Sequence, residues 1–351
     1  MKPQDLVRPE ILALKAYPVP SSEGMVKLDA MENPYTLPDG LRRELAAVLA
    51  RVDVNRYPAP SPQKLRDAIA RRMNVPAGLQ VLLGNGSDEL IQILITALAR
   101  SGAKMMYPSP TFVMYSMGGI FSGMQAVPVP LREDFSFDAD AFIARMQAEN
   151  PALVFIAYPN NPTGVLYPEA DIVKVIRACK GLVVVDEAYH VFAGKTFVQK
   201  INEFPNLIVI RTVSKLGLAG IRLGYLIGRP EWVEQLDKVR PPYNVGVLTQ
   251  AAALFMLERL DVLEGQAARI KGDRAALAEG IAALAGTKVF PSEANFLLVR
   301  VPDAGKTYEA LKQQNVLVRN LHPGLKNCLR VTVGTPDENR ILLTALREAL
   351  S

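Results

Sequence analysis

Cysteine is scarce in this sequence, which holds only Cys179 and Cys328 among its 351 residues. No C-x-x-C pair occurs, and two isolated cysteines form neither a disulfide framework nor a zinc module. We therefore expect both to be small core residues of a cytoplasmic protein, because the cytoplasm keeps thiols reduced. A chain of this length can bury a large core, so it needs no structural metal ion.

Long apolar runs are also missing. No stretch of about 18 apolar residues occurs, so we expect no membrane-spanning helix. The first twenty residues carry scattered charges and lack the apolar core of a secretory signal. Lys and Arg outnumber Asp and Glu by 40 to 35, but they are dispersed along the chain. Because nucleic-acid binding usually needs clustered basic charge, we expect neither a membrane nor a nucleic acid as a partner.

What the sequence does contain is an alternation of predicted strands and helices. Short apolar runs occupy residues 153–157, 182–185, 207–210 and 225–227, and a helical pattern covers residues 169–179 between two of them. Continuous runs of this kind are typical of strands buried on both faces of a mostly parallel sheet. The alternation predicts an α/β fold.

Two helices are predicted before these runs, each with a polar residue in position to cap it. Asp39 follows a proline and precedes an amphipathic pattern that includes Leu41 and Leu45. Ser87 precedes a second helix at residues 88–99. Both residue types are favoured N-caps, so we expect their side chains to bond the first turn.

The pattern changes after about residue 240. A long helical stretch at residues 248–284 is followed by shorter predicted elements. These are strands at 296–300, 316–319 and 329–333, a helix at 306–313 and a final helix from Pro336. We expect three parts: a large domain at 36–240, a smaller α+β domain at 241–351, and an N-terminal arm at 1–35 that packs with the small domain.

A lysine and an aspartate stand near the ends of two apolar runs. Lys215 follows the run at 207–210 and precedes a glycine-rich stretch, a place where active sites form in α/β sheets. Its amine can form a Schiff base with an aldehyde cofactor, although a lone loop lysine is more often simply solvated. Asp186 ends the run at 182–185, where a carboxylate can keep a pyridine nitrogen protonated, cap a helix or bind magnesium.

Two polar stretches extend this set of candidates. Residues 84–89 read GNGSDE, and glycines ahead of a helix let backbone N–H groups converge on a phosphate. Residues 158–164 read YPNNPTG and follow the run at 153–157, so Asn161 can donate to a ring oxygen. An ordinary turn explains either stretch on its own.

Together these motifs resemble the fold-type I pyridoxal-phosphate aminotransferases. The matching pieces, in chain order, are GNGSDE, PTF-VMY, NNPTG, VVVDEAY, RTVSK, GIRLGY, ANF and CLRVTVGT, and they extend from about Asn33 to Thr335. The resemblance implies a large domain with a mostly parallel seven-stranded sheet flanked by helices, plus a smaller α+β domain. Within that superfamily, ENPY at 32–35, NRYP at 55–58 and the late CLRVTVGT are similar to the histidinol-phosphate aminotransferases.

The resemblance implies an enzyme that carries pyridoxal 5'-phosphate as a Schiff base on Lys215. It would move an amino group between L-histidinol phosphate and 2-oxoglutarate or glutamate, in histidine biosynthesis. Two alternatives share much of the motif set: an aromatic amino acid aminotransferase and a threonine-phosphate decarboxylase. A third is a cofactor-binding regulator without catalysis, which would have no need of Lys215, Asp186 and Arg222 together.

The same resemblance assigns roles to individual residues. Lys215 would act as the base, Asp186 would hold the ring nitrogen, and Tyr189 with Asn161 would bond the phenolic oxygen of the cofactor. No metal ion is part of the implied site. The further cofactor-binding residues implied are Ser87, Asp88, Phe112, Ser214 and Arg222. The substrate-binding residues implied are Tyr17, Asn33, Arg319 and Arg330.

Tyr57 matches a tyrosine that, in this family, reaches the cofactor phosphate of the neighbouring subunit. The resemblance therefore implies a homodimer with shared active sites. The chain departs from the family at residues 214–220, where it reads SKLGLAG and many relatives read SKAFGLAG. The turn after Lys215 is one residue tighter, which leaves the local backbone and the direction of Arg222 open.

Overall fold

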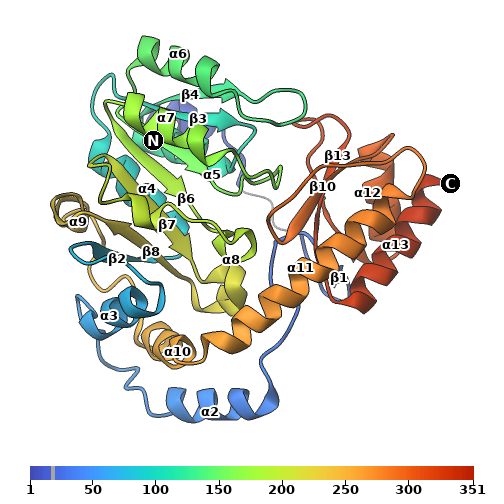
Figure 1. The fold of residues 1–351 in the computed structure, drawn as a ribbon, viewed down its shortest axis with the longest axis horizontal. Coiled ribbons are helices and arrows are strands. Elements are labelled where there is room, and N and C mark those ends of the chain that lie inside the picture. The colour runs from blue at the N-terminus through green and yellow to red at the C-terminus, as the bar shows by residue number, and fades with distance from the viewer. Residues whose placement is uncertain (17–19) are drawn as a thin grey trace.

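The computed structural model describes residues 1–16 and 20–351. A large α/β unit occupies one side of the molecule and a smaller unit of strands and helices the other, as Figure 1 shows. The long helix α11 (Leu260–Ala282) runs from beneath the large unit to the small one. The large mixed sheet, flanked by helices, confirms the α/β fold class.

The large unit is built on a seven-stranded sheet with its central strands fully buried. β8 runs antiparallel to both of its neighbours, whereas the other strand pairs are parallel. In spatial order the strands are β2 (Gln80–Asn85), β8 (Leu223–Gly228), β7 (Leu207–Thr212), β6 (Leu182–Asp186), β5 (Leu153–Ala157), β3 (Lys104–Ser109) and β4 (Gln125–Pro130). All four apolar runs identified in the sequence are strands of this sheet, because each is buried on both faces.

Helices cover both faces of the sheet. Alternate side chains of each strand enter two separate core clusters, so each face has its own apolar layer. One face is covered by α3 (Gln63–Arg72), α6 (Ala139–Glu149), α7 (Glu169–Ala178) and α10 (Val247–Leu257). The other is covered by α4 (Ser87–Leu98), α5 (Val113–Ser122) and α9 (Pro230–Asp237). The short α8 (His190–Ala193) follows β6, and α2 (Asp39–Leu49) packs on α10.

The small unit has an antiparallel four-stranded sheet of its own. Its order is β12 (Arg319–Asn320), β13 (Cys328–Thr332), β10 (Phe296–Arg300) and β9 (Lys288–Val289). The helices α12 (Ala304–Gln313), α13 (Pro336–Leu350) and α11 share one apolar core with it. The predicted strand at 316–319 is in fact two pieces, because β11 (Val316–Leu317) pairs with β1 (Val26–Lys27) and β12 pairs with β13.

The N-terminal residues contact both units. β1 pairs with β11, and Leu28 belongs to the apolar core of the small unit. Earlier in the chain, after the short turn Pro3–Asp5, α1 (Pro9–Leu12) contacts α5 of the large unit. Arg8 Nη2 donates there to the carbonyl oxygens of Ile120 and Phe121 at 3.1 and 2.6 Å. The boundaries at 35 and 240 stay predictions, and α10, which follows the second, packs on the large sheet.

Three local expectations were wrong. Asp39 and Ser87 do not cap their helices, because each helix begins at that residue and the N-caps are Pro38 and Gly86. The helical stretch at 248–284 is broken into α10 and α11. The expectation that both cysteines are buried core residues was confirmed. In the described ranges no helix is long and apolar enough to span a membrane.

Candidate active site

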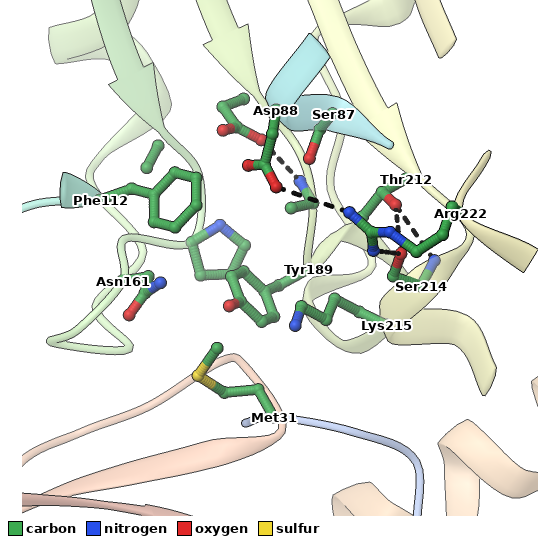
Figure 2. A pocket seen from close by; sticks show the side chains of 14 residues that line it. Met31, Ser87, Asp88, Phe112, Asn161, Tyr189, Thr212, Ser214, Lys215 and Arg222 are labelled. Carbon is green, nitrogen blue, oxygen red and sulfur yellow. Dashed lines mark hydrogen bonds and ion pairs between the residues drawn. The ribbon is translucent and has the colours of Figure 1, made fainter. Parts of the chain in front are cut away.

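A pocket of about 560 Å³ opens where β5, β6 and β7 end and α4 begins. Figure 2 shows side chains from all four elements pointing into it, with Met31 facing them from the opposite side. The lining residues are Met31, Ser87, Asp88, Phe112, Ala157, Pro159, Asn161, Asp186, Ala188, Tyr189, Thr212, Ser214, Lys215 and Arg222. The pocket thus brings together every predicted cofactor-binding residue except Tyr57.

Asp186 is the last residue of β6 and is 4% exposed. Tyr115 Oη donates to its Oδ2 at 2.7 Å, and the backbone N–H of Ala188 donates to its Oδ1 at 3.1 Å. Burial raises the pKa of Asp186 to about 6, although both hydrogen bonds lower it. The carboxylate is therefore placed to gain strongly from a cationic partner such as a protonated ring nitrogen.

A second buried charge lies beside the first but points away from the pocket. Glu187 Oε2 accepts from Arg211 Nε at 2.9 Å and from Thr196 Oγ1 at 2.9 Å, and the backbone N–H of Phe197 bonds Oε1. Glu187 and Arg211 are both buried, so each needs the other as its counter-charge. This pair fixes the chain that follows β6 and so helps to hold Asp186 in place.

Lys215 lies in a coiled turn, Ser214–Leu218, just after β7. Its Nζ donates to the carbonyl oxygen of Ala30 at 3.1 Å. Burial lowers the pKa of Lys215 to about 8, and the charge of Arg330 acts in the same direction. A lysine with this pKa has a substantial neutral fraction in mildly alkaline solution, as a nucleophilic amine requires.

The first turn of α4 forms a cradle for an anion. Ser87 and Asp88 begin the helix, whose free N–H groups and dipole favour negative charge. Arg222 Nη2 lies 3.6 Å from Asp88 Oδ2, and its Nη1 lies 3.5 Å from Ser214 Oγ. Gly86 has a φ of 79°, and a Cβ there would come within 2.7 Å of Arg222 Nη2, so glycine lets the guanidinium lie against the turn. These donors fit a phosphate group.

Asn161 and Tyr189 form the remaining sides together with Phe112. Asn161 Oδ1 accepts from Arg330 Nη1 at 2.6 Å, which brings β13 of the small unit to the pocket. The Tyr189 ring packs edge-on against Phe296, with 5.2 Å between ring centroids. Phe112 lines the pocket as a flat apolar face. A planar ring that carries a phosphate and a polar edge would thus find Phe112 against its face, the α4 terminus at its phosphate, and Asn161 with Tyr189 at its polar edge.

Residues 29–31 form a row of carbonyl groups across the pocket from the sheet. The carbonyl oxygen of Asp29 accepts from Arg330 Nη2 at 2.8 Å, and that of Ala30 accepts from Lys215. Met31 has a φ of 53°, and its carbonyl oxygen accepts from Asn295 Nδ2 at 3.0 Å. Lys215 and Arg330, two of the three cationic side chains of the site, are therefore bonded to the main chain of the N-terminal segment.

Three predicted residues, Asn33, Arg319 and Tyr57, do not line the pocket, and Arg330 reaches its edge through a hydrogen bond to Asn161. Asn33 Nδ2 instead donates to Leu216 O at 3.2 Å and to Gln266 Oε1 at 2.9 Å. Arg319 lies on β12, directly across the ladder from Arg330. Tyr57 is 82% exposed and stacks on Tyr243, with ring centroids 4.7 Å apart. Tyr17 lies outside the described residues.

The shortened turn after Lys215 is accommodated at Gly217. Its φ of 134° and ψ of 11° are accessible to glycine alone, and Asn33 Nδ2 would lie 2.8 Å from a Cβ there. Arg222 still reaches the pocket, in a left-handed conformation with a φ of 51°. The tighter turn therefore leaves the direction of Arg222 suited to an anion at the α4 terminus.

Sequence reasoning gave no role to Met31, Thr212 or Tyr115, the neighbour of Asp186. Tyr115 lies three residues after Phe112, and that spacing places both residues on one side of the start of α5. The spacing is a signal from which the place of Tyr115 could have been predicted. Met31 had no comparable local signal, because its place depends on contacts with Asn295 and Thr332, roughly 300 positions away. The lining residues include no histidine, and in the described ranges no cluster of His, Cys, Asp and Glu could hold a metal ion.

Comparisons with known proteins agree with this geometry. A model of the family "aminotransferase class I and II" matches residues 23–346. The chain is 56% identical to histidinol-phosphate aminotransferase 2 of Cupriavidus pinatubonensis, with 98% of this chain and 96% of that protein covered. It is 53% identical to the histidinol-phosphate aminotransferase of Chromobacterium violaceum, with 98% of each covered. The histidinol-phosphate aminotransferase structure from Sinorhizobium meliloti, in complex with pyridoxal-5'-phosphate, superposes with a TM-score of 0.87 at 25% identity, covering 98% of this chain and 97% of that one.

Proposed function

This chain belongs to the class I and II aminotransferases and, among them, to the histidinol-phosphate aminotransferases, and we propose that it moves an amino group between histidinol phosphate and 2-oxoglutarate. The observation that carries the proposal is the meeting of Lys215, Asp186 and Arg222 in one pocket of a chain so similar to enzymes of that name. Pyridoxal phosphate is its cofactor. When bound, it supplies an aldehyde for the amino group and a ring that withdraws electrons from the substrate α-carbon.

Three groups of this chain would hold the cofactor. Asp186 would pair with the ring nitrogen, where burial makes a charge-assisted bond strong. The α4 terminus and Arg222 would bind the phosphate, because a guanidinium offers forked donors and the helix end offers free N–H groups. Asn161 and Tyr189 would bond the ring oxygen, and Phe112 would cover one face of the ring.

Lys215 would move the proton of the reaction. Its Nζ would take the proton from the α-carbon of the substrate, as a general base with a pKa near 8 can do close to neutral pH. For this, Nζ must leave the carbonyl oxygen of Ala30, its present partner.

Arg330 would bind the carboxylate of glutamate. Its guanidinium is buried and bonded to Asn161 at the edge of the pocket, so an incoming carboxylate can replace a neutral acceptor with a charged one. Asn33, Arg319 and Tyr17 remain proposed substrate neighbours. Contact of Asn33 or Arg319 with substrate would need a different arrangement of the segment around Asn33 or of β12.

We also propose a cytoplasmic homodimer in which Tyr57 reaches the phosphate site of the second subunit. The exposed, stacked pair of Tyr57 and Tyr243 supports this, since rings that lie open to solvent suit a contact with another chain. The two free cysteines suit a reducing compartment. Sedimentation of the cofactor-loaded protein would test the dimer, and a monomer at micromolar concentration would contradict it.

A panel of amino donors tests the proposed reaction. Purified enzyme with pyridoxal phosphate and 2-oxoglutarate is given histidinol phosphate, phenylalanine or threonine phosphate, and glutamate formation is measured for each. We expect kcat/KM to be highest for histidinol phosphate. A preference for phenylalanine would indicate an aromatic amino acid aminotransferase instead, and release of carbon dioxide from threonine phosphate would indicate the decarboxylase.

A further inference from the structure

Tyr115 is the side chain that contacts Asp186 from behind the pocket. It lies on α5, is completely buried, and its Oη donates to Asp186 Oδ2 at 2.7 Å. Its ring stacks on Phe155 with centroids 4.5 Å apart and planes inclined by 5°. Phe112 packs edge-on against the same ring at 5.8 Å. One tyrosine thus contacts both the residue that would cover the cofactor ring and the residue that would bind its nitrogen.

Asp186 depends on this hydroxyl because little else stabilises its charge. The backbone N–H of Ala188 is the other donor to its carboxylate. The charged groups that face it from α4 and from its own strand end are Asp88 and Glu187, and both disfavour ionisation of Asp186. Burial raises the pKa of Tyr115 well above its ordinary value, so the phenol remains a proton donor wherever the enzyme works.

We propose that Tyr115 is a positioning residue that keeps Asp186 ionised and directs its free lone pairs toward the ring nitrogen of the cofactor. This inference rests on the proposed function, because it concerns the partner of that nitrogen. A carboxylate that accepts from Tyr115 and Ala188 has its rotation fixed by two donors on different elements. The remaining acceptor sites can then meet the cofactor without a search for orientation.

Tyr107 provides a matched control. It is a second buried tyrosine, 6% exposed, whose ring lies 6.0 Å from that of Tyr115. Its hydroxyl interacts with Ser116 rather than with Asp186. Tyr107→Phe and Tyr115→Phe each remove one oxygen from the same aromatic layer, but only the second removes a donor to the carboxylate.

The first measurement follows the carboxyl group itself in the cofactor-free full-length protein. Aspartate labelled with ¹³C at the carboxyl carbon is titrated by NMR, with Asp186→Asn used to assign the resonance. A hydrogen bond to a charged group is worth about one pKa unit or more, so Tyr115→Phe should raise the Asp186 midpoint by about 1 unit, a tenfold higher proton affinity. Tyr107→Phe should leave it within about 0.3 unit. Equal shifts in both variants, or none in Tyr115→Phe, would overturn the proposal.

The second measurement is the affinity for pyridoxal phosphate at pH 6 and pH 8. We expect Tyr115→Phe to weaken binding about tenfold relative to Tyr107→Phe, with the larger loss at pH 6, where more Asp186 is protonated in the variant. If wild-type protein binds no pyridoxal phosphate, the proposed function fails, yet the carboxyl titration still tests the link between Tyr115 and Asp186. Equal affinities in the two variants would show that the hydroxyl does not serve the cofactor.

A third measurement needs no Tyr115 variant and so covers the case in which Tyr115→Phe does not fold. Tyrosine labelled with ¹³C at Cζ is observed in wild-type and Asp186→Asn protein. The Tyr115 resonance should shift with the midpoint of Asp186 in the wild type and should lose that step in Asp186→Asn. A Tyr115 resonance that is indifferent to pH between 4 and 8 in the wild type would contradict the proposal.

Discussion

The two sides of the pocket are held in different ways. The sheet side, formed by the ends of β6 and β7 and the start of α4, is bonded within itself, as in Asp186 to Tyr115 and Ser214 to Thr212. The N-terminal side, formed by residues 29–31 and by Arg330, is bonded partly within itself and to the small unit, and partly across the pocket to Lys215 and Asn161. The sheet side is thus suited to a resident cofactor, and the N-terminal side to substrates that come and go.

The largest loss of activity should come from Lys215→Ala, because this substitution removes the amine that bonds the sheet side to the N-terminal side. We expect activity to fall by at least about 10³-fold, since both the covalent tether and the base are lost. The cofactor should no longer form an adduct that borohydride reduces, which absorbance and mass spectrometry would detect. Lys174, exposed on α7 and paired with Asp171, gives the control variant Lys174→Ala. A reducible adduct at full occupancy in Lys215→Ala would show that the lysine was assigned wrongly.

A substitution of Arg330 should weaken substrate binding on the N-terminal side and leave cofactor binding on the sheet side nearly unchanged. Arg330→Lys keeps the charge but loses the forked donors, so kcat/KM for glutamate should fall by about 10- to 100-fold, mainly through KM. The affinity for pyridoxal phosphate should change by less than about threefold, because the sheet side is intact. The same substitution at Arg319, across the ladder, should have a smaller effect. Loss of cofactor binding in Arg330→Lys, measured by absorbance titration, would contradict the division.

Gly217→Ala should lower stability at the turn that carries the lysine. A φ of 134° is unfavourable for alanine, and the new Cβ would meet the Asn33 side chain at 2.8 Å. We expect a loss of about 2 kcal/mol in the free energy of unfolding, measured by urea denaturation. Gly220→Ala, where a Cβ meets nothing within 4 Å and φ is not positive, should cost less than about 1 kcal/mol. Similar losses for both variants would mean that the turn tolerates alanine.

Asp186→Asn should have the smallest effect, and in cofactor-free protein it should increase the free energy of unfolding rather than lower it. The pKa of Asp186 is raised from 3.8 to about 6, so folding favours the protonated form and its contribution to stability is lost as pH rises through 6. Asparagine cannot ionise, so the variant should gain on the order of 1 kcal/mol over wild type at pH 8 and almost nothing at pH 4. Thermal unfolding at the two pH values measures this, and a variant less stable at pH 8 would contradict it.

The sequence predicts the sheet side better than the N-terminal side, and the reason is physical. Lys215, Asp186 and Asn161 each follow an apolar run, and parallel strands bring their carboxyl ends to one edge of a sheet. The places of Met31 and Asn295 depend on contacts between segments hundreds of residues apart, which no local pattern encodes. The apolar pattern also missed β2, β3 and β4, and of these β4 is only partly buried and contains prolines, which weakens its strand signal.

The carbonyl row at residues 29–31 has a consequence for which molecules the enzyme retains. The guanidinium of Arg330 and the amine of Lys215 each donate to a main-chain oxygen of this row. A ligand that replaces one of these carbonyl acceptors gains only the difference in hydrogen-bond free energy between its own acceptor and a neutral carbonyl. An uncharged amide or alcohol therefore gains almost nothing. A carboxylate gains substantially. We therefore expect Arg330 to favour ligands that carry an anionic group over neutral ones.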